Sequence, residues 1–337
     1  MAVTLHDVAS LAGVSIKTVS NVVNESPNVT ASTRARVLAA VDELGYQPNL
    51  SARSLRSGRT GAIGLVVPEL SLSYFAELAD AVIRAAEARR LAVLIEQTNG
   101  DREREIEVLS SPRMKFTDGV LFSPLGMGMD DADRLRVPYP LVLLGERIFG
   151  GPTDHVTMHN VEAARAATAY LIASGRRRIA VLGAHPGEVI GSAGLRLVGY
   201  RRALDDAGIA FDADLVAATT LWHRANGAVA MRDLLSRGVD FDAVFGLNDT
   251  LALGGMRVLQ ESGRRVPDDV AVIGFDDLDE AGYSLPSLTT VDPGRREIAE
   301  RAVAALVERI GGAAVPPREI LAEYRVVERE SAPALAH

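Results

Sequence analysis

The segment VSIKTVSNVVN, residues 14–24, combines helical spacing with side chains that form hydrogen bonds readily. Its apolar positions fall on one helix face, at Ile16 or Val19 and at Val22 and Val23. The other face carries hydroxyl, amide and ammonium groups, on Ser15, Lys17, Thr18, Ser20, Asn21 and Asn24. Such groups contact phosphates and base edges, and a helix fits the major groove of DNA. The pattern favours DNA binding; the alternative is the solvated surface of an ordinary helical domain.

Three short helices are expected to position these side chains. The first begins at a Thr4 cap and ends at a glycine. The second follows Ser15, and the third runs from about Thr30 to Leu44. The inward residues expected on the third helix are Val37, Leu38, Val41 and Leu44. Two short helices joined by a tight glycine-containing turn and supported by a third form a helix-turn-helix domain.

The charge of the chain is unevenly distributed. The formal net charge is −8, yet residues 1–60 hold six Lys or Arg against four Asp or Glu. A mildly basic head on an acidic body fits a head that meets a polyanion and a body that does not. Residues 46–61, YQPNLSARSLRSGRTG, are polar and typical of a plain linker between two globular regions.

From Ile63 onward, short apolar strands alternate with amphipathic helices. The expected strands lie in AIGLVVP, RLAVLIEQ, DGVLFSP, YPLVLLGE, RIAVLGA, LVAATTL, AVFGLND and VAVIGFDD. Continuously apolar strands between helices predict parallel sheets covered on both faces, and two runs of similar length predict two doubly wound lobes. The predicted fold class is therefore α/β. Small ligands bind beyond the carboxyl ends of such strands, which here carry VVPEL, LFSPL, GLNDT and IGFDD.

Catalytic chemistry finds little support in these residues. The chain has no cysteine, which excludes disulfides, thiolate nucleophiles and cysteine-ligated metals. The six histidines lack the spacing of a metal site, and no phosphate-binding glycine loop or G-x-S-x-G turn is present. No run of about 18 apolar residues and no signal-peptide layout occurs. We expect a cytoplasmic protein that is not an enzyme and that has no metal or other cofactor.

The chain resembles the lactose-repressor family of bacterial transcription regulators over nearly its whole length. In the head the resemblance rests on VTLHDVASLAGVSIKTVSNVVNESPNVTASTRARVLAAVDELGYQPNLSARSL. In the body it rests on RLVGYRRAL, FGLNDTLALGGMRVLQESGRRVPDDVAVIGFDD and PSLTTV. It implies a helix-turn-helix domain at 1–47, a hinge segment at 48–60 and a periplasmic-binding-protein-like core. One lobe of that core would comprise 61–160 with about 293–320, and the other 161–292 with about 321–332.

The resemblance implies roles for residues of the head. Ile16, Lys17 and Asn21 fall where the family's recognition helix reads operator bases. Asn suits the edge of adenine, whereas Lys suits a guanine or a phosphate. The residues that would touch the DNA backbone or fix the domain against it are Thr4, Ser15, Thr18, Ser20, Asn24, Val29, Thr30 and Tyr46.

The polar stretch after the head gains a second meaning from the resemblance. In the family it folds on DNA into a hinge helix, and a leucine from each subunit wedges into the minor groove. Leu55 holds that position, with Asn49, Ala52 and Arg53 beside it. Such a wedge costs about a few kcal/mol of base unstacking, which the contacts of the kinked DNA offset. Paired hinge helices imply a homodimer on roughly palindromic double-stranded DNA, and the lack of C-terminal leucine heptads also favours a dimer.

The resemblance further implies an effector pocket between the lobes. Arg196 lies where the family places an arginine that reaches the ligand, and Asp276 follows a buried strand. Across one cleft the two side chains can bind neighbouring hydroxyls as donor and acceptor, which suits a sugar. The other expected contacts are Asn248, Trp222, Tyr74, Phe75, Ser123 and Arg147. Taken singly, Arg196 would be an exposed helix residue, Asn248 and Asp276 caps, and Trp222 a core side chain.

Two binding functions compete for this pattern. A periplasmic sugar-binding protein would have the same core but a signal peptide in place of the helical head. A transcription regulator accounts for both parts, and we expect a repressor whose operator binding is controlled by a small effector, a sugar or a nucleoside. The effector would change the relation of the lobes and thereby the pairing of the hinge helices. No membrane partner is expected.

Overall fold

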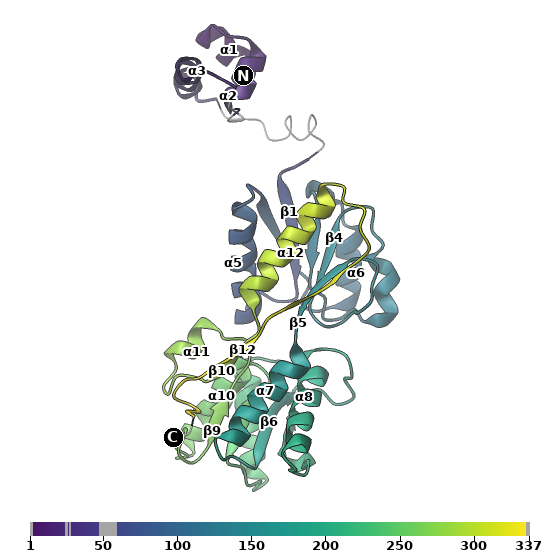
Figure 1. Ribbon diagram of the computed structural model, residues 1–337, viewed down its shortest axis with the longest axis vertical. Coiled ribbons are helices and arrows are strands. Elements are labelled where there is room, and N and C mark those ends of the chain that lie inside the picture. Colours follow the sequence, from purple (N-terminus) through teal and green to yellow (C-terminus); the bar gives the residue numbers. More distant parts are fainter. Residues whose placement is uncertain (1–2, 24–25, 27, 47–58, 335–337) are drawn as a thin grey trace. The chain divides into compact units, whose positions relative to one another are not determined.

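The computed structural model describes residues 3–23, 26, 28–46 and 59–334. The chain forms two compact units, residues 1–60 and 61–337, which are taken in turn (Figure 1). The predicted fold class, helix-turn-helix head and α/β core of parallel sheets, is confirmed. None of the helices in the described part of the chain is both long and apolar enough to cross a membrane.

The head consists of α1 (Leu5–Ala12), α2 (Ile16–Val23) and α3 (Ala31–Leu44). Gly13 ends α1 with a φ of 61°, a left-handed conformation that glycine adopts without strain. The buried core is Val8, Ala9, Ala12, Val19, Val22, Val37, Ala40 and Tyr46. On α2, therefore, Val19 is buried and Ile16 is exposed. The inward position expected for Leu38 is wrong: its side chain is 48% exposed, because α3 packs through Val37 and Ala40 instead.

Hydroxyl side chains begin all three helices of the head. Thr4 Oγ1 accepts a hydrogen bond from the Asp7 amide at 3.4 Å, and the Asp7 carboxylate accepts one from the Thr4 amide at 2.8 Å. Ser15 accepts the Thr18 amide at 3.1 Å. Thr30 likewise accepts the Thr33 amide at 3.4 Å. Each cap satisfies a backbone donor that a helix start leaves free, and is worth about 1 kcal/mol.

The first lobe of the core is built on a six-stranded parallel sheet in the order β11-β5-β4-β3-β1-β2. The strands are β1 (Ala62–Val67), β2 (Ala92–Gln97), β3 (Val120–Phe122), β4 (Leu141–Leu144), β5 (Asp154–Met158) and β11 (Glu319–Ala322). Its helices are α5 (Ser73–Glu87), α6 (Arg102–Ser110) and α12 (Arg295–Ile310), with short 3-10 turns at Pro112–Phe116 and Met129–Leu135. The expected burial of β2 is wrong: as an edge strand it exposes Leu94 and Ile95.

The second lobe is built on a four-stranded parallel sheet in the order β7-β6-β8-β9. These strands are β6 (Ile179–Ala184), β7 (Val216–Ala218), β8 (Ala243–Gly246) and β9 (Ala271–Ile273). The helices are α7 (Asn160–Ala173), α8 (Ser192–Asp206), α9 (Arg224–Ser236), α10 (Asp249–Glu261) and α11 (Asp279–Tyr283), with a 3-10 turn at Ala213–Leu215. Strands β6, β8 and β9 are buried throughout, as expected of a sheet covered by helices on both faces.

Three chain segments run between the two sheets (Figure 1). The first leads from β5 into α7, and the second from β10 (Thr290–Asp292) into α12. The third leads from β11 into β12 (Arg325–Val327), which pairs with β10 in an antiparallel ribbon. The sheets of the two lobes can therefore change their relation only by bending these three short segments.

Candidate effector cleft and DNA-binding surface

The outer face of α2 carries the polar side chains that the sequence singles out. Ile16 and Lys17 are exposed, and Ser20 and Asn21 are half-buried beside them. Val19 and Val22 anchor the helix from its other side. An exposed helix face of this composition has the groups that read base edges in a major groove.

Several other residues expected at DNA have a structural task within the head. Thr4, Ser15 and Thr30 cap helices, and the Thr18 and Ser15 hydroxyls lie 2.9 Å apart. Tyr46 is buried in the core, against which Val29 packs. Asn24, Asn49, Ala52, Arg53 and Leu55 lie outside the described residues.

The eight residues expected at the effector line one cavity in the core. It measures about 180 Å³, more than ten times the space that a single water needs. The eight are Tyr74, Phe75, Ser123, Arg147, Arg196, Trp222, Asn248 and Asp276. They come from both lobes, and from the carboxyl ends of strands or the helices that follow, where α/β folds bind ligands.

Arg196, on α8, lies at the centre of this arrangement and is 3% exposed. Its Nε donates to Asn160 Oδ1 at 2.8 Å, its Nη1 donates to the Leu247 carbonyl, and its Nη2 lies 3.6 Å from Asp276 Oδ1. The guanidinium carbon lies 3.6 Å from the ring centroid of Phe275 and 5.3 Å from that of Trp222. Stacking and charge pairing thus hold the cation in a fixed orientation.

Asp276 sits in a turn that follows β9, with an unusual φ of 118°. Its amide donates to the Val291 carbonyl at 2.9 Å, and its own carbonyl accepts Arg295 Nη1 at 2.6 Å. Burial raises the pKa of its carboxyl to about 7, although Arg196 and Arg295 act in the opposite direction. This carboxyl can accept a hydroxyl hydrogen in either protonation state, and in the protonated state it can also donate one.

Trp222 and Asn248 form the wall beside Arg196. The indole Nε1 donates to the Gly183 carbonyl at 2.9 Å, so that the indole offers a ligand only its ring. Asn248 caps α10 by accepting the Leu251 amide at 2.9 Å, and its Nδ2 donates to the Trp222 carbonyl at 3.2 Å. The cap expected as the alternative role of Asn248 is therefore present together with its place at the cavity.

The other lobe contributes an aromatic pair, a hydroxyl and a cation. The Tyr74 and Phe75 rings meet edge to face at 5.2 Å, and burial raises the pKa of Tyr74. Ser123 is buried. Arg147 Nη1 lies 3.3 Å from Glu188 Oε2 and also donates to the Ile190 carbonyl at 3.3 Å. Since Glu188 and Ile190 belong to the loop between β6 and α8, Arg147 joins the two lobes across the cleft.

Several polar side chains that also line the cavity were not predicted from the sequence, namely Glu69, Glu146, His185, Glu188, Ser192 and His223. Glu146 joins the lobes by accepting the Ser192 hydroxyl at 2.7 Å. His185 Nδ1 lies 3.0 Å from Glu188 Oε2, whereas its buried Nε2 has no hydrogen-bond partner among the described residues. The signal that could have found them is their place: all six follow a strand or begin a helix at the edge where the predicted pocket lies.

Comparison with known proteins agrees with both parts of this architecture. Residues 4–49 match the bacterial regulatory proteins of the lacI family, and residues 168–332 match the periplasmic binding protein-like domain. The transcriptional regulator CelR of Thermobifida fusca is 38% identical, over 97% of this chain and 98% of its own.

Two solved structures resemble the chain over almost its full length. A CelR–cellobiose complex has a TM-score of 0.72 and 34% identity, covering 98% of this chain and 99% of its own. The lac repressor dimer bound to operator and the anti-inducer ONPF has a TM-score of 0.84 and 28% identity, covering 99% and 100%. With a helix-turn-helix head, a two-lobed core and relatives of this similarity, the chain belongs to the lacI family of bacterial regulatory proteins.

Proposed function

We propose that the protein is a cytoplasmic transcriptional repressor, without catalytic activity, whose operator binding is controlled by a sugar bound between the lobes of the core. The observation that carries this proposal is the cavity lined from both lobes by Arg196, Asp276, Trp222 and Arg147, in a chain that also has a helix-turn-helix head. The similarity to the transcriptional regulator CelR supports DNA binding by the head. The CelR–cellobiose complex supports a sugar as the ligand.

The charge balance of the cavity favours an uncharged, hydroxyl-rich effector. Both guanidinium groups that line it already have a carboxylate partner there: Arg196 has Asp276, and Arg147 has Glu188. Glu69 and Glu146 add further carboxylates. A phosphorylated effector would need positive charge that is not already paired, whereas a sugar can hydrogen-bond to the outer edges of both pairs. The Trp222 ring suits the apolar face of a pyranose.

The proposed control is a population shift in the relation of the two lobes. Arg147–Glu188 and Glu146–Ser192 already join the lobes on one side of the cavity. A sugar that contacts both lobes would favour one arrangement over others, and the three crossing segments would carry that preference through the core. Such coupling between two sites typically amounts to about 1–3 kcal/mol.

On DNA, we propose that Lys17 and Asn21 contact the operator and that Leu55 wedges into the minor groove of a palindromic site. A homodimer would present two α2 helices to two half-sites. The lac repressor dimer on its operator supports this assembly. Tyr283 and Leu285, each 84% exposed, supply apolar surface that a second copy could cover.

The proposal is tested by a mobility-shift titration on the promoter DNA that flanks the protein's own gene. The full chain is added with and without cellobiose, other neutral sugars, sugar phosphates and nucleosides. We expect a palindrome-dependent shift that a neutral sugar alters and that its phosphate ester does not. No shift at low salt contradicts the repressor, and a response only to a phosphate ester or a nucleoside contradicts the neutral sugar.

A further inference from the structure

Three consecutive residues at the start of α10 contact both walls of the cleft. Asn248 and Thr250 turn toward the Trp222 loop: Asn248 Nδ2 and Thr250 Oγ1 both donate to the Trp222 carbonyl. Thr250 Oγ1 also lies 3.1 Å from Asn248 Oδ1, which accepts the Leu251 amide as well. Because the single hydroxyl hydrogen of Thr250 cannot be donated to both oxygens at once, the Leu251 amide is the constant donor to Asn248 Oδ1. Asn248 can therefore offer a ligand its remaining N–H and one acceptor position of this oxygen.

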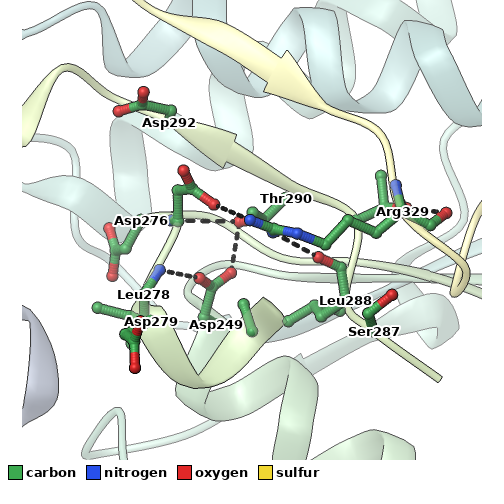
Figure 2. Close-up of polar contacts among 12 residues, drawn as sticks. Asp249, Asp276, Leu278, Asp279, Ser287, Leu288, Thr290, Asp292 and Arg329 are labelled. Carbon is green, nitrogen blue, oxygen red and sulfur yellow. Dashed lines mark hydrogen bonds and ion pairs between the residues drawn. The ribbon is translucent and has the colours of Figure 1, made fainter. Parts of the chain in front are cut away.

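Asp249 turns the other way, toward the turn that bears Asp276. Figure 2 shows its carboxyl between Thr290 of β10 and the backbone of Leu278. Oδ1 accepts the Thr290 hydroxyl at 2.5 Å, and Oδ2 accepts the Leu278 amide at 2.8 Å. The Asp249 amide itself donates to the Phe275 carbonyl at 2.7 Å. Asp249 is fully buried and has no ion-pair partner among the described cations. Its carboxyl is therefore satisfied by these hydrogen bonds.

The turn that Asp249 holds has a backbone that needs support. Asp276 and its neighbour Asp277 both have positive φ, 118° and 49°, which non-glycine residues adopt at a cost. Arg329 Nη2 binds the Asp277 carboxylate at 2.6 Å, and Arg295 Nη1 binds the Asp276 carbonyl at 2.6 Å. The Asp249 carboxyl supplies a further contact to this turn, by accepting the Leu278 amide.

Two glycines let α10 approach both walls closely. A Cβ on Gly274 would lie 2.1 Å from Asp249 Oδ1. A Cβ on Gly183 would lie 2.4 Å from Leu251 Cδ1 and 3.2 Å from Trp222 Nε1. The start of α10 is therefore fitted against β6 and β9 at the two points where the cleft walls begin.

We propose that Asn248, Asp249 and Thr250 are positioning residues of the effector site. Asn248 and Thr250 fix the Trp222 ring beside Arg196, and Asp249 fixes the Asp276 carboxyl opposite it and ties it to the crossing strand β10. The assignment rests on the proposed function in that it takes this cleft as the effector site. It gives Asp249 and Thr250, which do not line the cavity, a defined effect on what the cavity binds.

The Trp222 arm is tested by fluorine NMR, because Trp222 is the single tryptophan of the chain. The full chain is labelled with 5-fluorotryptophan, and T250V is compared with T168V. Thr168 is an equally buried threonine whose hydroxyl donates to the Ala164 carbonyl at 2.9 Å, away from the cavity. We expect T250V to move the resonance by more than its linewidth, T250S to restore it and T168V to leave it in place. Equal effects of T250V and T168V, or no effect of T250V, overturn this arm.

The Asp276 arm is tested by hydrogen exchange in the full chain, read on the peptide that covers residues 275–284. We expect D249A to speed exchange there at least tenfold while distant peptides keep wild-type rates. D249N retains an acceptor for the Leu278 amide and should keep its protection. D154N is the matched control, since Asp154 is an equally buried carboxylate bound by Arg309 and Arg318 in the other lobe.

If D249A does not fold, a second variant still tests the role of Asp249. T290V keeps the shape of the side chain and removes the hydroxyl that binds Asp249 and that also accepts the Asp277 amide at 3.4 Å. It takes the place of D249A when exchange is read at the Leu278 amide, which Asp249 alone accepts, with an expected threefold or greater increase there. Unchanged exchange at this peptide, or a uniform increase over the chain, overturns the proposal. Both measurements are made without ligand or DNA. They can therefore contradict the positioning roles without contradicting the proposed repressor function, and the mobility-shift titration can contradict that function without contradicting the positioning roles.

Discussion

The guanidinium of Arg196 and the carboxyl of Asp276 lie 3.6 Å apart with almost no exposed surface, in a cavity that residues of both lobes line. Phe275 and Trp222 flank the arginine, so the pair cannot separate without disturbing the aromatic wall. A buried ion pair of this kind contributes little net stability but orients hydrogen-bonding groups sharply. The pair therefore serves recognition better than folding.

Loss of this arginine is predicted to abolish the effector response. R196A removes the ion-pair partner of Asp276 and the fixed donor from the cleft. We expect the sugar that acts on the wild type to bind at least about 100-fold more weakly, equivalent to roughly 3 kcal/mol. Operator affinity measured without sugar should stay within about twofold. R202A, an exposed arginine on the same helix, is the control, and an unaltered response of R196A removes Arg196 from the site.

Stability is predicted to depend on pH through Asp276. Its pKa is raised from 3.8 to about 7 by burial, so the folded state holds a proton that the unfolded state releases at lower pH. This contribution is fully present below about pH 4 and is lost as the pH rises toward 7.

Between pH 4.5 and 7.5 the free energy of unfolding of wild type should fall more than that of D276N, by up to about 3 kcal/mol. Urea titrations of both proteins measure the difference. The pKa of Asp249 is raised by burial and by the charge of Asp276, so D276N lowers it and reduces the pH dependence of that protein further, which adds to the expected difference. Parallel slopes would refute the shift.

The bridge between Arg147 and Glu188 is predicted to favour the lobe arrangement that binds the sugar. Because both side chains are partly exposed, the pair should be worth only about 0.5–1 kcal/mol. A double-mutant cycle of R147Q and E188Q should give a two- to fivefold coupling in sugar affinity. The surface pair Arg165 and Asp206 should give none. Strictly additive effects of R147Q and E188Q would show that the bridge has no part in closure.

Two residues of α2 are predicted to affect DNA binding in different ways. Because a Lys17 contact to a phosphate releases one counterion whatever the sequence, K17A should weaken binding to operator and to unrelated DNA alike. It should also reduce the slope of log affinity against log salt concentration by about one. N21A should cost about 1–3 kcal/mol on the operator and little on unrelated DNA, because an amide reads a base edge. Fluorescence anisotropy at several salt concentrations separates the two, and equal losses of N21A on all DNA would contradict base reading.

Much of the site could be predicted because strand ends are visible in a sequence. Arg196 is found by family resemblance and Asp276 by its place after a buried strand, and both line the cavity. The contact between Arg147 and Glu188 could not be foreseen, since it depends on how closely two lobes approach. The exposure of Leu38 and of β2 was missed for a related reason. An apolar side chain in a sequence does not show whether a neighbouring element covers it in the fold.

The central claim, that the cleft and the DNA-binding head act on one another, is tested most directly by reciprocal titration. Trp222 fluorescence reports sugar binding by the full chain, with and without saturating operator DNA. Linkage requires that operator change the affinity for the sugar by the same factor by which the sugar changes the affinity for operator. We predict equal factors, in the range of about 5- to 150-fold. A sugar affinity that operator leaves unchanged would contradict the account.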